Sequence, residues 1–306
     1  MAVRVSGVNP TDWKRRSTGD PDGEQVPNQD GAGVVDAVGD GVDPARIGQR
    51  VWLWEAAWQR SEGTAQEYTV LPGHKAVPLP DHASFELGAS IGIPGMTAHR
   101  ALTLGEGGPE RLAPGALAGR TVLVAGGAGA VGNAAIQLAR WSGATVLTTV
   151  SSPEKAKLAA TAGAHHVVDY RAEDAAAAVR ALAPQGVDLV VEVAPTANAA
   201  LDLAVLAPNG TVAFYADGSG PEVTLPVREL MTRNLHWAGV LIYTVPAEAK
   251  AHAVTALQAA LAEGALRGGE DAGLPWHRYP LARTAEAHDA VQGAAVGKVL
   301  IEVSAG

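Results

Sequence analysis

The sequence predicts an α/β protein in which a doubly wound parallel sheet is combined with a second, β-rich domain. Three observations predict it. Strand-like and helical runs alternate between residues 116 and 243. The first ninety residues instead carry short strand-like pieces broken by Gly, Pro and Asp. The chain has 306 residues, which is longer than a usual single domain.

The alternating part contains apolar, β-rich runs separated by helical patterns of about ten residues or more. The expected strands are 121–127 (TVLVAGG), 144–150, 166–170, 187–193 and 211–216. The first expected helix follows the glycines and ends near Trp141, and further helices are expected at 153–162, in the ARALA region and at 197–206. Continuous apolar strands that alternate with helices are typical of a parallel sheet covered on both faces.

The remaining segments indicate a separate domain. The runs GVVDAVG, QRVWLW and AQEYTVLP predict short strands joined by turns. The tail from Tyr279 to Val303 predicts one short helix and a final strand that returns to this first domain. The doubly wound domain would then be an insertion, with boundaries at 1–92 plus 244–306 for the β-rich domain and 93–243 for the inserted one.

Composition excludes several classes of function. The net charge of −9 argues against nucleic-acid binding, which relies on neutralising phosphates. The chain has no cysteine, and its nine histidines show no HExxH-like spacing, so we expect no metal site. No apolar run approaches the roughly 18 residues of a membrane-spanning helix, and the N-terminus lacks the pattern of a secretory signal. A cytoplasmic location is therefore expected.

The stretch AGGAGAVG contains Gly127, Gly129 and Gly132 in a GxGxxG pattern between an apolar strand and a helix. In this setting Gly127 permits a tight turn, Gly129 lets the backbone approach a pyrophosphate, and Gly132 lets the helix pack closely on the strand. The amides of the helix N-terminus, including those of Ala128, Ala130 and Val131, would face the phosphates. The sequence thus predicts a dinucleotide site, although a structural turn would have the same pattern.

The choice of cofactor is made at the end of the second strand, about 20 residues further on. An Asp or Glu there holds the ribose of NAD, whereas this chain has Ser151, Ser152 and Lys155. Two hydroxyls and an ammonium suit the 2′-phosphate of NADPH. Glu154 complicates the interpretation, but at a helix start it can point to solvent, and Lys155 could equally be a solvated helix residue. We favour NADPH.

Several motifs together resemble the zinc-free quinone oxidoreductase branch (zeta-crystallin-like) of the medium-chain dehydrogenase/reductase superfamily. They are GVNPTDWK (7–14), DGAGVVDAVG (30–39), GTAQEYTVLP (63–72), GASIGIPGMTAHRAL (88–102), the glycine turn, and the tail from Tyr279 to Val303. The resemblance runs nearly end to end. It implies a Rossmann domain inserted in a GroES-like catalytic domain, with the active site in the cleft between them.

The resemblance also implies roles for single residues. Asn9 would reach the nicotinamide ribose, and Thr97 would lie near the cofactor. Tyr170 would stack near the adenine, and Lys298 would close the cofactor side from the C-terminal segment. Each has a structural alternative: Asn9 as a turn former, Tyr170 as a half-buried strand-end aromatic, and Lys298 as a solvated residue before a strand.

The chain departs from the family pattern at two places. The family begins with an additional strand or two before the GVNP motif, which here stands almost at the start. Ala130 replaces another glycine, which is tolerable where φ stays negative.

The chemistry implied is zinc-independent hydride transfer from NADPH to a small planar quinone or an α,β-unsaturated carbonyl (enone). No general acid is assigned. Trp52 and Trp54, which would share one strand face, are candidate aromatic walls for such a substrate, with domain core as the equal alternative. The segment 235–243 would be an edge strand that pairs two copies, which predicts a homodimer. An enoyl-thioester reductase of a biosynthetic pathway and a non-catalytic NADPH-binding protein remain as alternatives.

Overall fold

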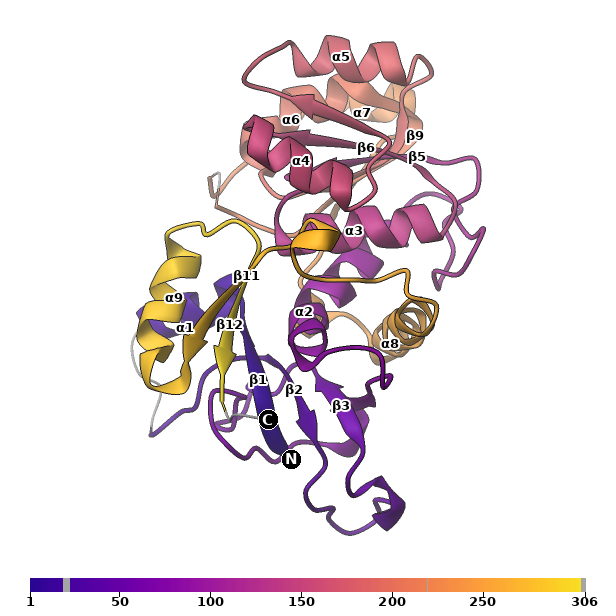
Figure 1. The fold of residues 1–306 in the computed structure, drawn as a ribbon. Coiled ribbons are helices and arrows are strands. Elements are labelled where there is room, and N and C mark those ends of the chain that lie inside the picture. The colour runs from indigo at the N-terminus through magenta and orange to yellow at the C-terminus, as the bar shows by residue number, and fades with distance from the viewer. Residues whose placement is uncertain (19–22, 219, 304–306) are drawn as a thin grey trace. The chain divides into compact units, whose positions relative to one another are not determined.

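The computed structural model describes residues 1–18, 23–218 and 220–303, which divide into two compact units (Figure 1). The first unit contains Met1–Pro94, Arg267–Glu270 and the segment from Pro275 onward. The second unit contains Gly95–Leu266 and Asp271–Leu274. The chain thus leaves the first unit after Pro94, completes most of the second, and returns at Arg267 apart from the short segment Asp271–Leu274, as expected for an inserted domain.

The first unit is built on a six-stranded sheet in the order β11-β12-β1-β2-β3-β4. Its strands are β1 (Ala2–Val8), β2 (Asp30–Val34), β3 (Arg50–Leu53), β4 (Ala76–Pro78), β11 (Trp276–Pro280) and β12 (Lys298–Glu302). The C-terminal β12 pairs antiparallel with β1 in the register Gly7↔Leu300, so the tail completes the N-terminal sheet. Helices α1 (Pro10–Ser17) and α9 (Thr284–Gln292) pack against each other at this end of the sheet.

The strand expected at 65–72 is wrong: that segment forms only an isolated bridge between Ala2 and Tyr68. Its inward residue Thr69 is buried while Tyr68 and Val70 are 60% and 75% exposed, and backbone hydrogen bonds tie Thr69 N–H to Met1 O and Val3 N–H to Glu67 O without building a ladder. Helix α1, β1 and β11 were not expected from the sequence. Asn9, Pro10 and Asp12 nevertheless form a helix-start signal, in which the Asp12 carboxylate accepts from the Asn9 backbone N–H at 2.7 Å.

The second unit is the expected parallel α/β sheet, with the order β10-β9-β8-β5-β6-β7 and parallel pairing throughout. Its strands are β5 (Thr121–Ala125), β6 (Thr145–Val150), β7 (His166–Asp169), β8 (Val187–Glu192), β9 (Leu206–Phe214) and β10 (His236–Gly239). Its helices are α3 (Ala130–Trp141), α4 (Pro153–Thr161), α5 (Ala175–Leu182), α6 (Pro195–Val205), α7 (Val227–Arg233) and α8 (Ala247–Ala262), and α2 (Phe85–Leu102) joins it to the first unit.

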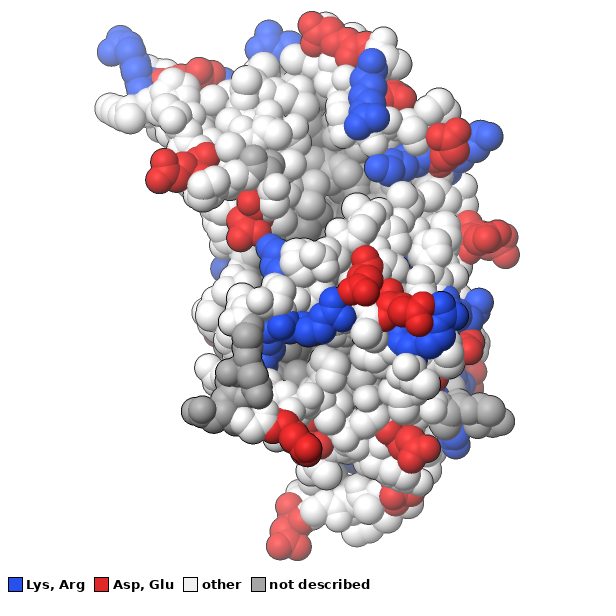
Figure 2. Space-filling model, turned by 90° about the vertical axis from the view of Figure 1, so that its left-hand side faces the viewer, with Lys and Arg blue, Asp and Glu red and all other residues white. Residues whose placement is uncertain are grey.

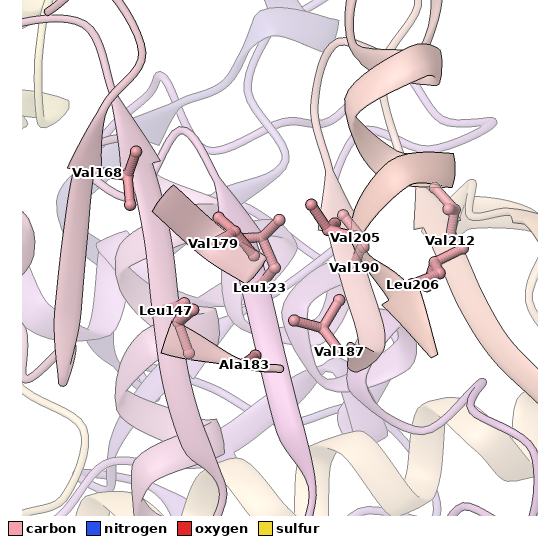
Figure 3. Close-up of a cluster of buried hydrophobic side chains, with 10 residues drawn as sticks. All are labelled: Leu123, Leu147, Val168, Val179, Ala183, Val187, Val190, Val205, Leu206 and Val212. Carbon is pink, nitrogen blue, oxygen red and sulfur yellow. The ribbon is translucent and has the colours of Figure 1, made fainter. Parts of the chain in front are cut away.

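Right-handed crossovers place α3 and α4 on one face of this sheet and α5 and α6 on the other (Figure 1). Figure 3 shows the core beneath α5 and α6, where Leu123, Leu147, Val190 and Val212 of four neighbouring strands meet Val179 of α5. These strands are continuous runs of Val and Leu because both faces of the sheet are covered. Strands β5 and β8 are neighbours although they are not consecutive, so the strand order reverses between them.

The structure ends the second unit near residue 266, whereas the sequence predicted a boundary at 243. The difference is helix α8. Its Leu257 is fully buried, and a Cβ placed on Gly95 of α2 would lie 2.9 Å from Leu257 Cδ2. The apolar side chains of α8 therefore belong to the core of the second unit, which an Ala-rich helical sequence does not reveal.

Candidate cofactor and catalytic sites

The glycine turn follows β5 at the point where the strand order of the sheet reverses, which is where open α/β sheets bind their ligands. The left-handed backbone of the turn lies at Gly126, with φ of +72°. The sequence predicted the tight turn at Gly127, but the residue with the left-handed backbone is Gly126. A Cβ on Gly127 would lie 2.2 Å from Thr148 Oγ1, so this glycine permits close approach to β6.

The other two glycines have the geometry expected of them. A Cβ on Gly132 would lie 2.4 Å from the carbonyl oxygen of Gly126, so only glycine lets α3 approach the turn this closely. Gly129 is the exposed N-cap of α3, and its Cβ position meets only the Gly126 carbonyl oxygen, at 3.4 Å. Ala130 is the first residue of α3, so its backbone is helical and the replacement of glycine causes no strain. The turn is thus a backbone cradle open at Gly129, with helix-terminal amides to bind a pyrophosphate.

The edge beside this turn is formed by the end of β6. Lys155 Nζ donates to Ser151 Oγ at 2.9 Å, and Ser152 is the N-cap of α4. Glu154 is fully exposed, and hydrogen bonds to its own amide and from Ser152 lower the pKa of its carboxyl. The Glu154 carboxylate is therefore exposed and bonded to Ser152, while the Lys155 ammonium contacts Ser151.

Tyr170 lies at the same edge. Its backbone N–H donates to Val150 O, the last carbonyl of β6, at 3.1 Å, and its side chain is 51% exposed. An exposed aromatic ring next to Ser151 suits the stacking role expected of it. Thr97 is buried in the middle of α2, and its proximity to a cofactor stays a prediction.

The first unit contains a buried polar network around Asn9. Asn9 Nδ2 donates to Asp30 Oδ2 at 2.7 Å, and Lys298 Nζ donates to Asn9 Oδ1 at 2.8 Å. Asp30 Oδ1 also accepts from the backbone N–H of Ile93 at 2.8 Å. Lys298 Nζ lies 3.5 Å from Asp30 Oδ2. The two ends of the Asn9 amide are thus fixed by Asp30 and Lys298, which orients the side chain.

Burial dominates the electrostatics of this network. Desolvation raises the pKa of Asp12 to about 7, against the hydrogen bond from Asn9, and raises the pKa of Asp30 against the attraction of Lys298. Desolvation also lowers the pKa of Lys298, which Asp30 and Asp12 oppose. Lys298 is only 2% exposed, so the solvated alternative considered for it does not describe its position.

Two glycines make room for these charges. A Cβ on Gly92 of α2 would lie 2.2 Å from Asp30 Oδ1. A Cβ on Gly7 of β1 would lie 3.1 Å from Lys298 Cε and 2.0 Å from the carbonyl oxygen of Ala89. The network is therefore built into the packing of α2 on the sheet.

Trp52 is fully buried on β3 and pairs with Ala32 and Val77, and Trp54 lies one residue beyond the strand, 5% exposed. The Trp54 ring meets His74 edge-on at 6.1 Å between centroids. These positions support the domain-core interpretation of both rings over that of substrate walls.

The described residues 1–18, 23–218 and 220–303 contain no group of three or more His, Asp or Glu side chains arranged to bind a metal ion. No helix in these ranges is both long and apolar enough to span a bilayer. Figure 2 shows basic and acidic side chains interspersed over the face that it draws.

Comparisons with known proteins agree with this architecture. Residues 1–81 match the alcohol dehydrogenase GroES-like domain, and residues 130–259 match the zinc-binding dehydrogenase family model. The human quinone oxidoreductase is 31% identical over 98% of this chain and 88% of its own length. The chain belongs to the quinone oxidoreductase family. Within the medium-chain dehydrogenase/reductase superfamily, this is the zinc-free branch.

Solved structures of similar proteins support the assignment of this chain to the quinone oxidoreductase family. A mycobacterial protein complexed with NADPH superposes with a TM-score of 0.81 at 31% identity, over 99% of this chain and 90% of its own. An NAD-dependent alcohol dehydrogenase superposes with a TM-score of 0.83 at 27% identity, over 99% of this chain and 91% of its own. Neighbours that differ in their nicotinamide cofactor thus share the fold.

Sequence reasoning missed Gly126, Asp12 and Asp30 of these sites, and also two buried carboxyl groups of the second unit, Glu192 at the end of β8 and Asp202 on α6. Asp30 begins the motif DGAG, and Asp202 is a lone acid in the apolar helix sequence ALDLAVLA. An isolated carboxylate on an apolar face is a signal that could have been used, because such groups are rarely buried without a partner.

Proposed function

We propose that this quinone oxidoreductase family member is an NADPH-dependent reductase that transfers a hydride to a quinone or an enone without a metal. The observation that carries the proposal is the cluster of Ser151, Ser152 and Lys155 at the end of β6, next to a fully exposed Glu154. An ammonium beside a hydroxyl can bind a 2′-phosphate, and the Glu154 carboxylate is engaged by its own amide and by Ser152, so it is not held as a free acceptor for a ribose 2′-hydroxyl.

The residues present suit a dinucleotide. The open backbone at Gly129 and the helix-terminal amides of Ala130 and Val131 would hold the pyrophosphate, and Tyr170 would cover the adenine. NADPH, when bound, supplies the hydride. In the first unit, Asp30 and Lys298 orient the Asn9 amide, which is the group proposed to meet the nicotinamide ribose. No step needs an ionised side chain as nucleophile, and no general acid is assigned.

The test is a panel of quinones, enones and acyl thioesters, each assayed with NADPH and with NADH. Turnover of quinones or enones with a preference for NADPH supports the proposal. A preference for acyl thioesters would instead identify the protein as an enoyl-thioester reductase. NADPH binding without turnover of any acceptor would indicate a non-catalytic role. Equal use of NADH would contradict the assignment of Ser151, Ser152 and Lys155.

The cofactor preference is tested more sharply by Lys155→Glu. Charge reversal next to a 2′-phosphate should raise KM for NADPH by about tenfold or more, which corresponds to roughly 1.4 kcal/mol, and should leave KM for NADH nearly unchanged. Lys157→Glu on the same helix, with an exposed side chain, is the matched control and should have little effect on either. Equal changes for the two cofactors would show that Lys155 does not contact the 2′-phosphate.

We also propose a homodimer formed through β10. This strand pairs only with β9 within the described part of the chain, so its other edge is available for a second copy. One chain has a mass of 31.2 kDa, and light scattering should give twice that value. The mass of a single chain at micromolar concentration would overturn the dimer proposal. The cytoplasmic location stays a prediction.

A further inference from the structure

A pair of buried carboxyl groups lies in the second unit near the strand end from which the cofactor turn begins. Glu192 is the last residue of β8, and Asp202 lies on α6; both are fully buried. Strands β8 and β5 are paired up to Val191↔Val124, so Glu192 lies next to the end of β5, where the glycine turn begins.

Glu192 organises the loop that follows β8. Its Oε1 accepts a short hydrogen bond from the backbone N–H of Ala194, and its two oxygens accept from Asn198 Nδ2 at 3.0 and 3.2 Å. This fixes the segment from Val193 to the first turn of α6. Val193 in turn reaches the cofactor turn, since a Cβ on Gly126 would lie 3.2 Å from Val193 Cγ1.

Both carboxylate oxygens of Asp202 are buried, and neither accepts a hydrogen bond from a donor among the described residues. A carboxyl in this position can be satisfied only by keeping its proton and donating it to a neighbouring acceptor. Burial raises the pKa of Asp202 to about 9, and the charge of Glu192 and a hydrogen bond to it act in the same direction. Burial also raises the pKa of Glu192.

None of the other titratable or charged groups described around the pair supplies a charge or a donor that would take the place of the shared proton. Tyr215, just after β9, donates its backbone N–H to Glu192 O at 3.1 Å, and burial and the Glu192 charge raise the pKa of its phenol, which stays neutral. Arg233 of α7, paired with Glu229, and Arg180 of α5 donate to carbonyl oxygens near the C-terminus of α6.

We propose that Asp202 is a positioning residue for the cofactor site: it shares one proton with Glu192, and this shared proton holds the loop after β8 against the glycine turn. When Asp202 loses the proton to solvent, two adjacent buried carboxylates repel each other. The loop then shifts away from Gly126, and a second negative charge lies near the phosphate-binding amides. Both effects weaken NADPH binding, so affinity falls as pH rises above neutrality. The inference rests on the proposed function only in requiring that the protein binds NADPH.

The experiment measures the NADPH dissociation constant by cofactor fluorescence between pH 7 and 9.5. In the wild-type protein the constant should rise by about fourfold, since a carboxyl with a pKa of about 9 keeps its proton in only roughly a quarter of the molecules at pH 9.5. Asp202→Asn and Asp202→Ser, which donate a hydrogen bond without titrating in this range, should reduce the rise to less than about 1.5-fold. Glu173→Gln, which removes an exposed acid from the same unit, should behave as wild type.

A purely structural role for Asp202 would change affinity equally at every pH, so the slope against pH is the deciding readout. A wild-type constant that is flat with pH would overturn the inference, even if neither variant folded. So would variants that retain the full wild-type slope. Absence of NADPH binding at every pH in all four proteins would instead overturn the proposed function.

Discussion

At the scale of single residues, Lys298 shows how an ionised group is kept in a protein interior. It is 2% exposed and lies between Asn9 and Asp30. Removing one partner of a buried ion pair costs about 3–5 kcal/mol, because the charge left behind has lost its compensation. Lys298→Met should therefore lower the free energy of unfolding of the first unit by about this amount at pH 8, measured by denaturant unfolding.

The loss in Lys298→Met should shrink at pH 5. Burial already raises the pKa values of Asp12 and Asp30, and without the ammonium both carboxyls protonate more readily as pH falls. Lys157→Met, on the exposed side of α4, is the control for losing a lysine. A cost below about 1 kcal/mol, the value typical of surface pairs, would mean that Lys298 is solvated.

The sequence could point to Lys298 and Asn9 as site residues but could not show that they touch each other, since they are 289 positions apart in the chain. Glu192 and Asp202 were missed for a related reason. Their significance depends on a shared buried environment, and periodicity describes only one element at a time.

At the scale of elements, the N-terminal half of α2 is held close to β2 by glycines. Gly88 faces the Ala32 side chain, and Gly92 faces the Asp30 carboxylate. A Cβ added at Gly92 would lie 2.2 Å from Asp30 Oδ1. Alanine is intrinsically better in a helix than glycine by about 1 kcal/mol. A clash with a fixed buried carboxylate outweighs this gain, since overpacking costs about 1–3 kcal/mol or more.

Gly92→Ala should therefore destabilise the protein by about 1–3 kcal/mol in denaturant unfolding. It should also disturb Asn9 through Asp30 and raise KM for the cofactor. Gly39→Ala is the matched control, since no atom lies within 4 Å of its Cβ position and its φ is not positive. A Gly92→Ala protein as stable as wild type would show that α2 can move away from β2 at little cost.

Elements with a strong local signal were predicted well. The five parallel strands expected between residues 121 and 216 are confirmed within a few residues, except that β9 begins earlier, at Leu206. Errors occurred where the pattern is short or where the segment does not complete a ladder with a neighbouring strand. The segment 65–72 alternates without being a strand, and β11 has too few apolar residues to be recognised as one.

At the scale of the whole molecule, two opposing sets of buried groups determine how stability depends on pH. In the second unit, burial lowers the pKa of His99 to about 3 and raises that of Asp202 to about 9. At pH values between its unfolded-state pKa and its folded-state pKa, each group binds a different number of protons in the two states. The free energy of unfolding therefore changes with pH in that range.

The signs differ for the two groups. Unfolded His99 takes up a proton that the folded protein does not bind, so its contribution to stability is lost as pH falls below its ordinary pKa of 6.5. Folded Asp202 keeps a proton that the unfolded chain releases, so its contribution is complete below its ordinary pKa of 3.8 and is lost as pH rises towards about 9. The two slopes oppose each other between pH 3.8 and 6.5, and only the carboxyl acts from neutral pH upward.

We therefore expect the second unit to be most stable on the acidic side of neutrality and to lose stability from about pH 6.5 to 9, at up to about 1.4 kcal/mol per pH unit. Scanning calorimetry from about pH 4 to 9 measures it. Asp202→Asn should flatten the curve above pH 6.5 and make stability fall on acidification below it, because the loss due to His99 is then unopposed. His99→Gln should leave the alkaline slope unchanged and extend it below pH 6.5, because only the Asp202 contribution remains. A melting temperature that rises from pH 7 to 9 in the wild-type protein would contradict the assignment of a retained proton to the Glu192–Asp202 pair.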